Sequence, residues 1–164
     1  MKEPVTSAER VGRVVTRLRI GIVAVVIIAL AVLLGWTFIA PPEKANPDNV
    51  AQVERGRQIY AANCAVCHGA KLEGEANWME RKANGRLPAP PHDASGHTWH
   101  HADQQLFDIV KNGVTPYAGP GYQSDMPAFK GILSDADVLA VLAYIKHSWP
   151  QEIRERQSQI TAQN

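Results

Sequence analysis

The chain has 164 residues, enough for one domain of ordinary size and an appendage, and its formal net charge is +1. Residues 1–40 carry five basic and two acidic side chains, whereas residues 41–164 carry 12 basic and 14 acidic ones. Because a nucleic-acid-binding protein concentrates basic side chains on its folded part, this slightly acidic remainder excludes nucleic acid as a partner.

Residues 20–40 contain no charged side chain. A helix of this length is about 31 Å long, which matches the hydrocarbon core of a membrane. The alternative is a cleaved signal peptide, whose apolar region is usually about 7–15 residues long with small residues before the cut. Here the run is longer, and a cut after Ala40 would place Phe38 where a small side chain is needed. We therefore predict a single uncleaved transmembrane anchor.

Four arginines within the ten residues before this segment indicate its orientation. Cytoplasmic flanks of membrane spans are enriched in Lys and Arg. We expect residues 1–19 to be a basic, cytoplasmic N-terminus and the chain to pass once through the inner (cytoplasmic) membrane. The rest of the chain is then periplasmic.

The part after the anchor divides into a linker, a domain and a tail. Prolines with polar neighbours indicate an extended linker over residues 41–49. No strand pattern is present in residues 50–149, so we predict an all-α domain there. Residues 150–164 form a polar C-terminal tail, either a short surface helix or disordered.

Three helices are expected in this domain. Apolar residues recur at helical spacing over residues 50–63. The second helix, 103–112, begins with Asp103 as its N-cap. The third, 134–147, opens with a capping box in which Asp137 stands three residues after the N-cap Ser134. Residues 70–101 and 113–125 are predicted loops.

Cys64, Cys67 and His68 form a Cys-x-x-Cys-His motif directly after the first of these helices. Two thiols at this spacing reach two vinyl groups of one haem, and the next imidazole reaches its iron. A thioredoxin-like redox pair expects a βαβ context, and a zinc site needs further ligands at matching spacing; the sequence offers neither. The motif predicts one covalently bound haem c with His68 as an iron ligand.

Met126 is the predicted second axial ligand of the iron. It lies on a Gly/Pro-rich loop before the last helix, far enough along the chain to cross the opposite face of the haem. Met79 is only 11 residues past His68 and is expected to be a packing or surface residue. The remaining competitors are four histidines: His92, His97, His100 and His101.

Three of those histidines, His97, His100 and His101, surround Trp99 in one short segment. One hypothesis places this segment at the haem propionates, with the Trp99 indole N–H as a donor. A second makes the histidines a copper or zinc site, since imidazole suits both metals. In a third, the histidines cap helices and face water.

With these residues in place, the region 50–149 resembles the class I, monohaem cytochromes c. That family has an N-terminal helix, the Cys-x-x-Cys-His motif, a methionine loop and a C-terminal helix. Its N-terminal helix carries a glycine and an aromatic residue where Gly56 and Tyr60 stand, and its C-terminal helix presents an aromatic residue that Tyr144 matches. The resemblance implies that these two helices cross closely.

The resemblance also implies that a proline carbonyl accepts the Nδ1–H of the axial histidine and orients its ring. Pro88, Pro90 and Pro91 are available, and we favour Pro90. His92 departs from the family pattern, in which leucine often follows such prolines.

The function expected from these features is one-electron transfer at a membrane, by a carrier rather than an enzyme. The expected partners are a quinol-oxidising complex as donor and a terminal oxidase as acceptor. The alternatives are a fixed haem c subunit of a larger oxidoreductase, a haem-based sensor with an open iron, and a metal-handling protein.

Overall fold

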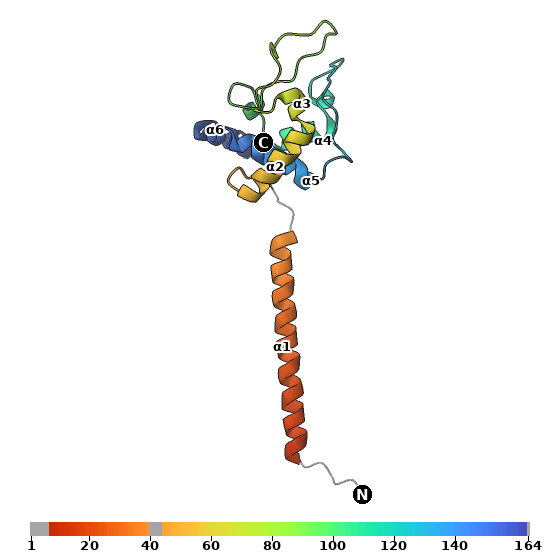
Figure 1. Ribbon diagram of the computed structural model, residues 1–164, viewed down its shortest axis with the longest axis vertical. Helices are drawn as coiled ribbons and strands as arrows, with labels where there is room; N and C mark the ends of the chain where they lie inside the picture. Colours follow the sequence, from red (N-terminus) through yellow and green to blue (C-terminus); the bar gives the residue numbers. More distant parts are fainter. Residues whose placement is uncertain (1–6, 40–43, 164) are drawn as a thin grey trace. The chain divides into compact units, whose positions relative to one another are not determined.

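The computed structural model describes residues 7–39 and 44–163, and the side chains of residues 16–33 and 44–163. Residues 1–6 of the predicted basic terminus, Ala40 and the first three residues of the predicted linker lie outside the described residues. The described part is helical, and it contains an isolated bridge between Lys130 and Leu133 but no strand. The chain forms two compact units, which are described separately (Figure 1).

The first unit contains helix α1, Ser7–Ile39. Its window Thr16–Leu33 is long and apolar enough to cross a membrane, and none of that window is buried. Large apolar side chains such as Leu18 and Ile28 are more than half exposed. A helix of this length and composition is a candidate membrane anchor, and signal sequences share the same features.

The second unit is built on the crossing of α2, Val50–Asn63, and α5, Asp135–His147. A Cβ atom at Gly56 would collide with the carbonyl oxygen of Ala140, so the two helices pack backbone against backbone. Beside this contact the rings of Tyr60 and Tyr144 lie 5.4 Å apart. The close crossing expected from the sequence is therefore present.

Two clusters of buried apolar residues flank this crossing. The first contains Leu106 of α4, Asp103–Asn112, with Val138 and Leu142 of α5. The second contains five residues: Tyr60, Leu72, Val141, Ile145 and Trp149. The haem-attachment motif lies beside the second cluster, because Cys64 packs against it.

The capping box of α5 is present as predicted, with Ser134 as N-cap and Asp137 closing it. The predicted N-cap of α4 is wrong: Ala102 holds that position and Asp103 is the first helical residue. The physical reason is that the Asp103 carboxylate is used elsewhere. Both its oxygens accept hydrogen bonds from Lys146, at 2.8 and 2.7 Å.

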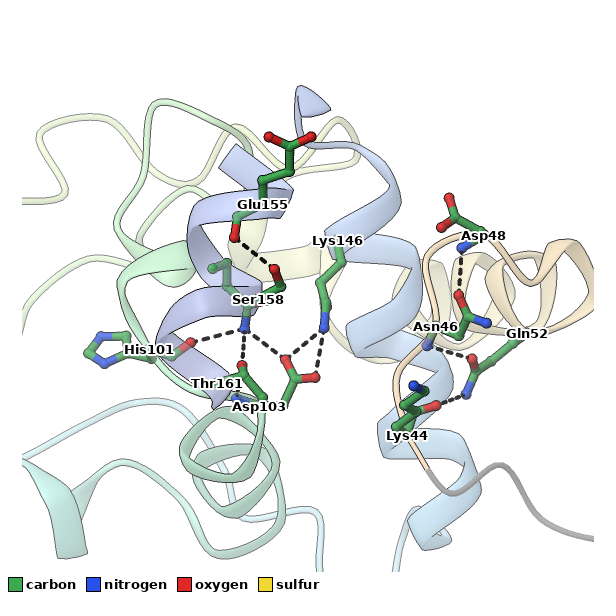
Figure 2. A network of polar contacts seen from close by, with 11 residues as sticks. Lys44, Asn46, Asp48, Gln52, His101, Asp103, Lys146, Glu155, Ser158 and Thr161 are labelled. Carbon is green, nitrogen blue, oxygen red and sulfur yellow. Dashed lines mark hydrogen bonds and ion pairs between the residues drawn. The ribbon is translucent and has the colours of Figure 1, made fainter. Parts of the chain in front are cut away.

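The tail forms a helix, α6, Gln151–Ala162, which packs onto the domain through a polar network (Figure 2). Gln157 is fully buried, and its Nε2 donates to the Asp103 carboxylate and the His101 carbonyl oxygen. Arg154 of the same helix pairs with Asp48 at 2.9 Å. These polar contacts, together with the packing of Ile153 on the second cluster, fix α6.

Residues 44–49 of the predicted linker also pack against the domain. Ala45 is buried in the first cluster. The Gln52 side chain bonds to the residues before and after it, donating to the Lys44 carbonyl oxygen and accepting from the Asn46 N–H (Figure 2). Further along, the Nδ1 atom of His147 lies 2.8 Å from the carbonyl oxygen of Pro47. The folded domain therefore begins at or before Lys44.

Candidate haem site

The Cys-x-x-Cys-His motif spans the junction between α2 and a single-turn helix, α3, Ala65–His68. Cys64 caps both helices, with its N–H bonded to the Tyr60 carbonyl oxygen. One turn of helix separates the two cysteines, and Cys67 is exposed whereas Cys64 is half-buried. This turn carries both cysteines and ends at His68, which is buried.

The state of the Cys64 thiol bears on the alternative chemistries of the motif. Burial raises its pKa to about 11, and the neighbouring Cys67 adds to the effect. A reactive redox cysteine has a lowered pKa and an electropositive surrounding. The raised pKa of the buried Cys64 thiol therefore disfavours the redox-pair hypothesis. Moreover, no group of three or more His, Cys, Asp or Glu side chains in the described residues could hold a metal ion.

The imidazole of His68 is held at one edge by a main-chain carbonyl. Its Nδ1 lies 2.8 Å from the Pro90 oxygen, which can only accept, so Nδ1 carries the proton and donates it. Burial lowers the pKa of His68, and the bond to Pro90 only partly opposes this shift. The ring is therefore neutral at neutral pH, with the lone pair of Nε2 available for a metal.

The segment that carries Pro90 is itself firmly attached to the domain. The His92 N–H donates to the Leu72 carbonyl oxygen at 2.8 Å, and the Trp149 indole donates to the His92 carbonyl oxygen at 2.7 Å. Gly96 permits the chain to fold back, because a Cβ there would collide with the Pro91 oxygen. The acceptor for His68 is thus in a fixed position.

His92, which the sequence offered only as a competing ligand, instead stacks on His68. The ring centroids are 4.0 Å apart and the planes differ by 24°. Burial lowers the pKa of His92 well below its usual range, with smaller contributions from His68 and His97. The position of His92, two residues after Pro90, indicates that it lies near His68. Sequence spacing alone does not reveal that the two rings stack.

The methionine loop, defined here as residues 113–133, carries Met126 in a half-buried position. The Met126 N–H donates to the Ser124 hydroxyl at 3.0 Å, and the adjacent Asp125 pairs with Arg86. By contrast, Met79 is 74% exposed. Of these two methionines, Met126 has the more enclosed side chain.

Trp99 lies in the short 3-10 helix η1, Thr98–His100, with its ring against the second cluster and the Arg156 guanidinium 5.1 Å from it. Its Nε1 is buried and has no hydrogen-bond partner among the described residues. A buried indole N–H normally finds an acceptor. A haem propionate is such an acceptor, so this atom fits the predicted cofactor, as do the imidazole and thioether donors.

The histidines around Trp99 do not converge on one point. The His97 ring stacks on Trp78 with centroids 5.3 Å apart, and the ring centroids of His100 and Trp99 are 3.7 Å apart. The His101 ring makes an edge contact with His97 and lies 3.3 Å, Nδ1 to Oε1, from Gln105. Ring contacts with neighbouring side chains thus account for these histidines, and the described residues give no support to a second metal site.

A helical frame that presents Cys-x-x-Cys-His beside a buried, carbonyl-bound histidine defines a c-type haem protein. The cytochrome c family model matches residues 53–149, and the chain belongs to this family, as a class I monohaem member. It therefore binds one haem c covalently, and Cys64 and Cys67 fit the attachment motif. The bound haem supplies an iron that changes oxidation state by one electron, so the chain functions in haem-based electron transfer.

Three curated relatives show where this domain recurs. The chain is 34% identical to a thiosulfate dehydrogenase of Stutzerimonas stutzeri over 70% of its own length and 34% of the relative's. It is 35% identical to a cytochrome c6 of Picosynechococcus sp., over 61% and 76% respectively. It is 29% identical to the cbb3-type cytochrome c oxidase subunit FixP of Azorhizobium caulinodans, over 62% and 31%. The chain thus spans about a third of two of these proteins, and no solved structure matches it.

Proposed function

We propose that this chain is a membrane-tethered electron carrier whose haem iron is ligated by His68 and Met126. The observation that carries the proposal is the state of His68, which is buried, bonded through Nδ1 to Pro90, and left with Nε2 to bind iron. A thioether from Met126 favours reduced iron and raises the potential. With both axial positions filled, no position remains for a substrate, so the chain is a carrier rather than an enzyme.

Two further residues act on the haem in this proposal. Pro90 orients His68 and raises its basicity as a ligand through the 2.8 Å contact with Nδ1. Trp99 donates its indole N–H to a propionate, because that buried atom has no acceptor among the described residues.

The proposed location is the inner membrane, with residues 1–19 in the cytoplasm and the haem domain in the periplasm. Support comes from the apolar window Thr16–Leu33 and the arginines that precede it. Residues 44–49 pack on the domain, so four residues, 40–43, separate this packed segment from the end of α1 at Ile39. So short a connection keeps the haem domain close to membrane-bound partners.

The proposed partners are a quinol-oxidising complex as donor and a terminal oxidase as acceptor. One relative supports a second candidate function: its name describes a subunit of a cbb3-type cytochrome c oxidase. In that case the chain is a fixed haem c subunit that relays electrons within one complex. Purification in a gentle detergent separates the two, because a carrier elutes as a lone chain and a subunit elutes in a stoichiometric complex.

The ligand set is tested by Met126→Ala. We expect the ferric protein to lose the weak near-infrared band of methionine-ligated haem, and the reduced protein to gain CO binding at neutral pH. The potential should fall by a substantial part of the roughly 0.8 V range over which axial ligands act. Met79→Ala is the matched control and should leave all three properties unchanged. CO binding by the reduced wild-type protein would overturn the proposal and favour a haem sensor.

The anchor is tested by the intact mass of the purified holoprotein. If the anchor is uncleaved, the measured mass should equal that of the chain with its apolar segment retained, plus one haem. The protein should then leave the membrane only in detergent. A mass that corresponds to a chain beginning near Pro41, recovered without detergent, would identify the apolar segment as a signal peptide instead.

A further inference from the structure

The ring of His68 is contacted at one edge and on one face by the same short segment. At the edge, the Pro90 carbonyl oxygen lies 2.8 Å from Nδ1. On the face, the ring of His92 stacks with centroids 4.0 Å apart and an interplanar angle of 24°. Both contacts oppose rotation of the imidazole plane. The hydrogen bond fixes the direction of Nδ1–H, and the stacked ring restrains the face of the imidazole.

The His92 ring can restrain its neighbour because it is itself held on several sides. Its Nδ1 is 2.8 Å from the hydroxyl oxygen of Thr98, and Thr98 is buried. That hydroxyl also lies within 3.4 Å of the Pro91 carbonyl oxygen. The ring of Tyr60 meets His92 edge-on, with centroids 6.4 Å apart at 74°. Both main-chain polar groups of His92 are bonded as well, to Leu72 and to Trp149.

We propose that His92 is a positioning residue which, through its stack on His68, sets the rotation of the axial imidazole about the bond between iron and Nε2. The orientation of that plane relative to the porphyrin nitrogens determines how unpaired spin is distributed over a ferric haem. Leucine, which often occupies this position in the family, fills comparable volume but has no flat face. His92 therefore adds a second restraint on the ring plane to the one that the Pro90 bond provides.

This inference rests on the proposed ligation by His68, and it goes beyond that ligation by naming what fixes the ring plane. Thr98 belongs to the same device, because its hydroxyl oxygen lies 2.8 Å from Nδ1 of His92 and holds the edge of that ring. The device is local: among the described residues, the ring and hydroxyl contacts named above come from residues 60, 68 and 90–98. It can therefore be altered without touching the cysteines or the methionine loop.

The test uses the ferric holoprotein and three variants: His92→Leu, His92→Phe and Thr98→Val. Paramagnetic proton NMR of the four haem methyl groups and the anisotropy of the ferric EPR spectrum report the imidazole orientation. We expect His92→Leu to change the order and spread of the methyl shifts and to broaden the EPR features. His92→Phe, which keeps a flat ring, should restore most of the wild-type pattern, and Thr98→Val should give a smaller change than His92→Leu.

The matched control is His147→Leu, because His147 also contacts a carbonyl oxygen through Nδ1 but lies on the exposed surface of α5. It should leave the methyl shifts unchanged. Wild-type methyl shifts in His92→Leu would overturn the proposal. If His92→Leu does not fold, wild-type methyl shifts in Thr98→Val would overturn it instead. The optical spectrum of the wild-type protein tests the proposed function separately. A low-spin spectrum with methionine ligation would support the proposed ligation by His68 and Met126, whatever the His92 variants show.

Discussion

The two segments that our proposal places on opposite faces of the haem are held very differently. Residues 89–98 are tied to the domain by main-chain bonds to Leu72 and by the Trp149 indole, and within the segment Gly96 packs on Pro91 with no room for a side chain. In the methionine loop, Gly119 and Gly121 have open space around them, and the loop borders a hollow of about 530 Å³. The Arg86–Asp125 pair that links the loop to residues 70–101 is well exposed.

This difference assigns different tasks to the two sides. The His68 side is rigid and, in our proposal, fixes the orientation of one iron ligand through Pro90 and His92. The Met126 side is a loop that is joined to the frame mainly at its end, where the Phe129 and Lys130 N–H groups bond to carbonyl oxygens of α4. A rigid side keeps reorganisation during electron transfer small, while a looser side can respond to a partner.

The largest expected effect comes from removing the covalent haem, which in our proposal lies between the two sides. Cys64→Ser with Cys67→Ser should abolish covalent haem and prevent cooperative folding, because the cofactor forms much of the core between the two segments. Haem staining after denaturing electrophoresis measures attachment, and circular dichroism during heating measures cooperativity. Cys67→Ser alone is the control and should keep haem through one thioether. A double variant with a sharp thermal transition would show that the protein core is self-sufficient.

The next effect tests the frame on which the rigid side is built. Gly56→Ala places a methyl group against the Ala140 carbonyl oxygen and must push α2 away from α5. Overpacking of this kind costs about 1–3 kcal/mol, and it outweighs the gain in helix propensity of about 1 kcal/mol. Denaturant unfolding of the holoprotein measures the loss. Ala62→Val on the exposed side of α2 should change stability by less than about 0.5 kcal/mol.

Sequence reasoning succeeded where the signal is local. The Cys-x-x-Cys-His motif, the capping box of Ser134 and the helix over residues 50–63 each depend on neighbours within a few positions, and the structure contains them. The close crossing at Gly56 followed from a family resemblance, because nothing local in α2 specifies its partner helix. The roles of Met126, Pro90 and Trp99 at the haem remain predictions.

Other features depend on distant partners or on polar burial, and patterns of apolar residues do not reveal these. The tail from Gln151 reads as polar, yet Gln157 is fully buried because its amide bonds to Asp103 and His101, more than 50 positions away. The same network moved the start of α4 away from the predicted N-cap, since the Asp103 carboxylate binds Lys146. The stack of His92 on His68 joins residues 24 positions apart.

A smaller effect is expected where the methionine loop meets residues 70–101. Asp125→Asn removes the ion pair with Arg86, which as an exposed pair is worth about 0–1 kcal/mol. That energy should appear in ligand exchange at Met126 rather than in global unfolding, because it fixes the loop and not the frame. We expect external imidazole to displace the methionine at a concentration up to about fivefold lower. Arg57→Gln, which removes an exposed pair on α2, should leave imidazole binding unchanged. Equal shifts in both variants would show that the loop is not held by this pair.

The smallest effect lies at Ser134, where the methionine loop ends and the rigid frame begins. Ser134→Ala removes the cap of α5 and should cost about 1 kcal/mol at neutral pH.

The stability that this cap contributes should also depend on pH. Hydrogen bonding from Ser134, followed by Arg55, lowers the pKa of Asp137 below its ordinary value of about 4. A lowered pKa in the folded state adds stability above the ordinary value and loses it as the pH falls through the folded one. The difference between wild type and Ser134→Ala should therefore shrink below about pH 4, as followed by denaturant unfolding across pH. Ser158→Ala on α6 is the control, since its hydroxyl bonds only to the Glu155 carbonyl oxygen and should give a difference that does not vary with pH. A Ser134→Ala difference that is the same at pH 7 and in acid would mean that Asp137 does not act through the cap, and the boundary between loop and frame would then rest on the Phe129 and Lys130 contacts with α4.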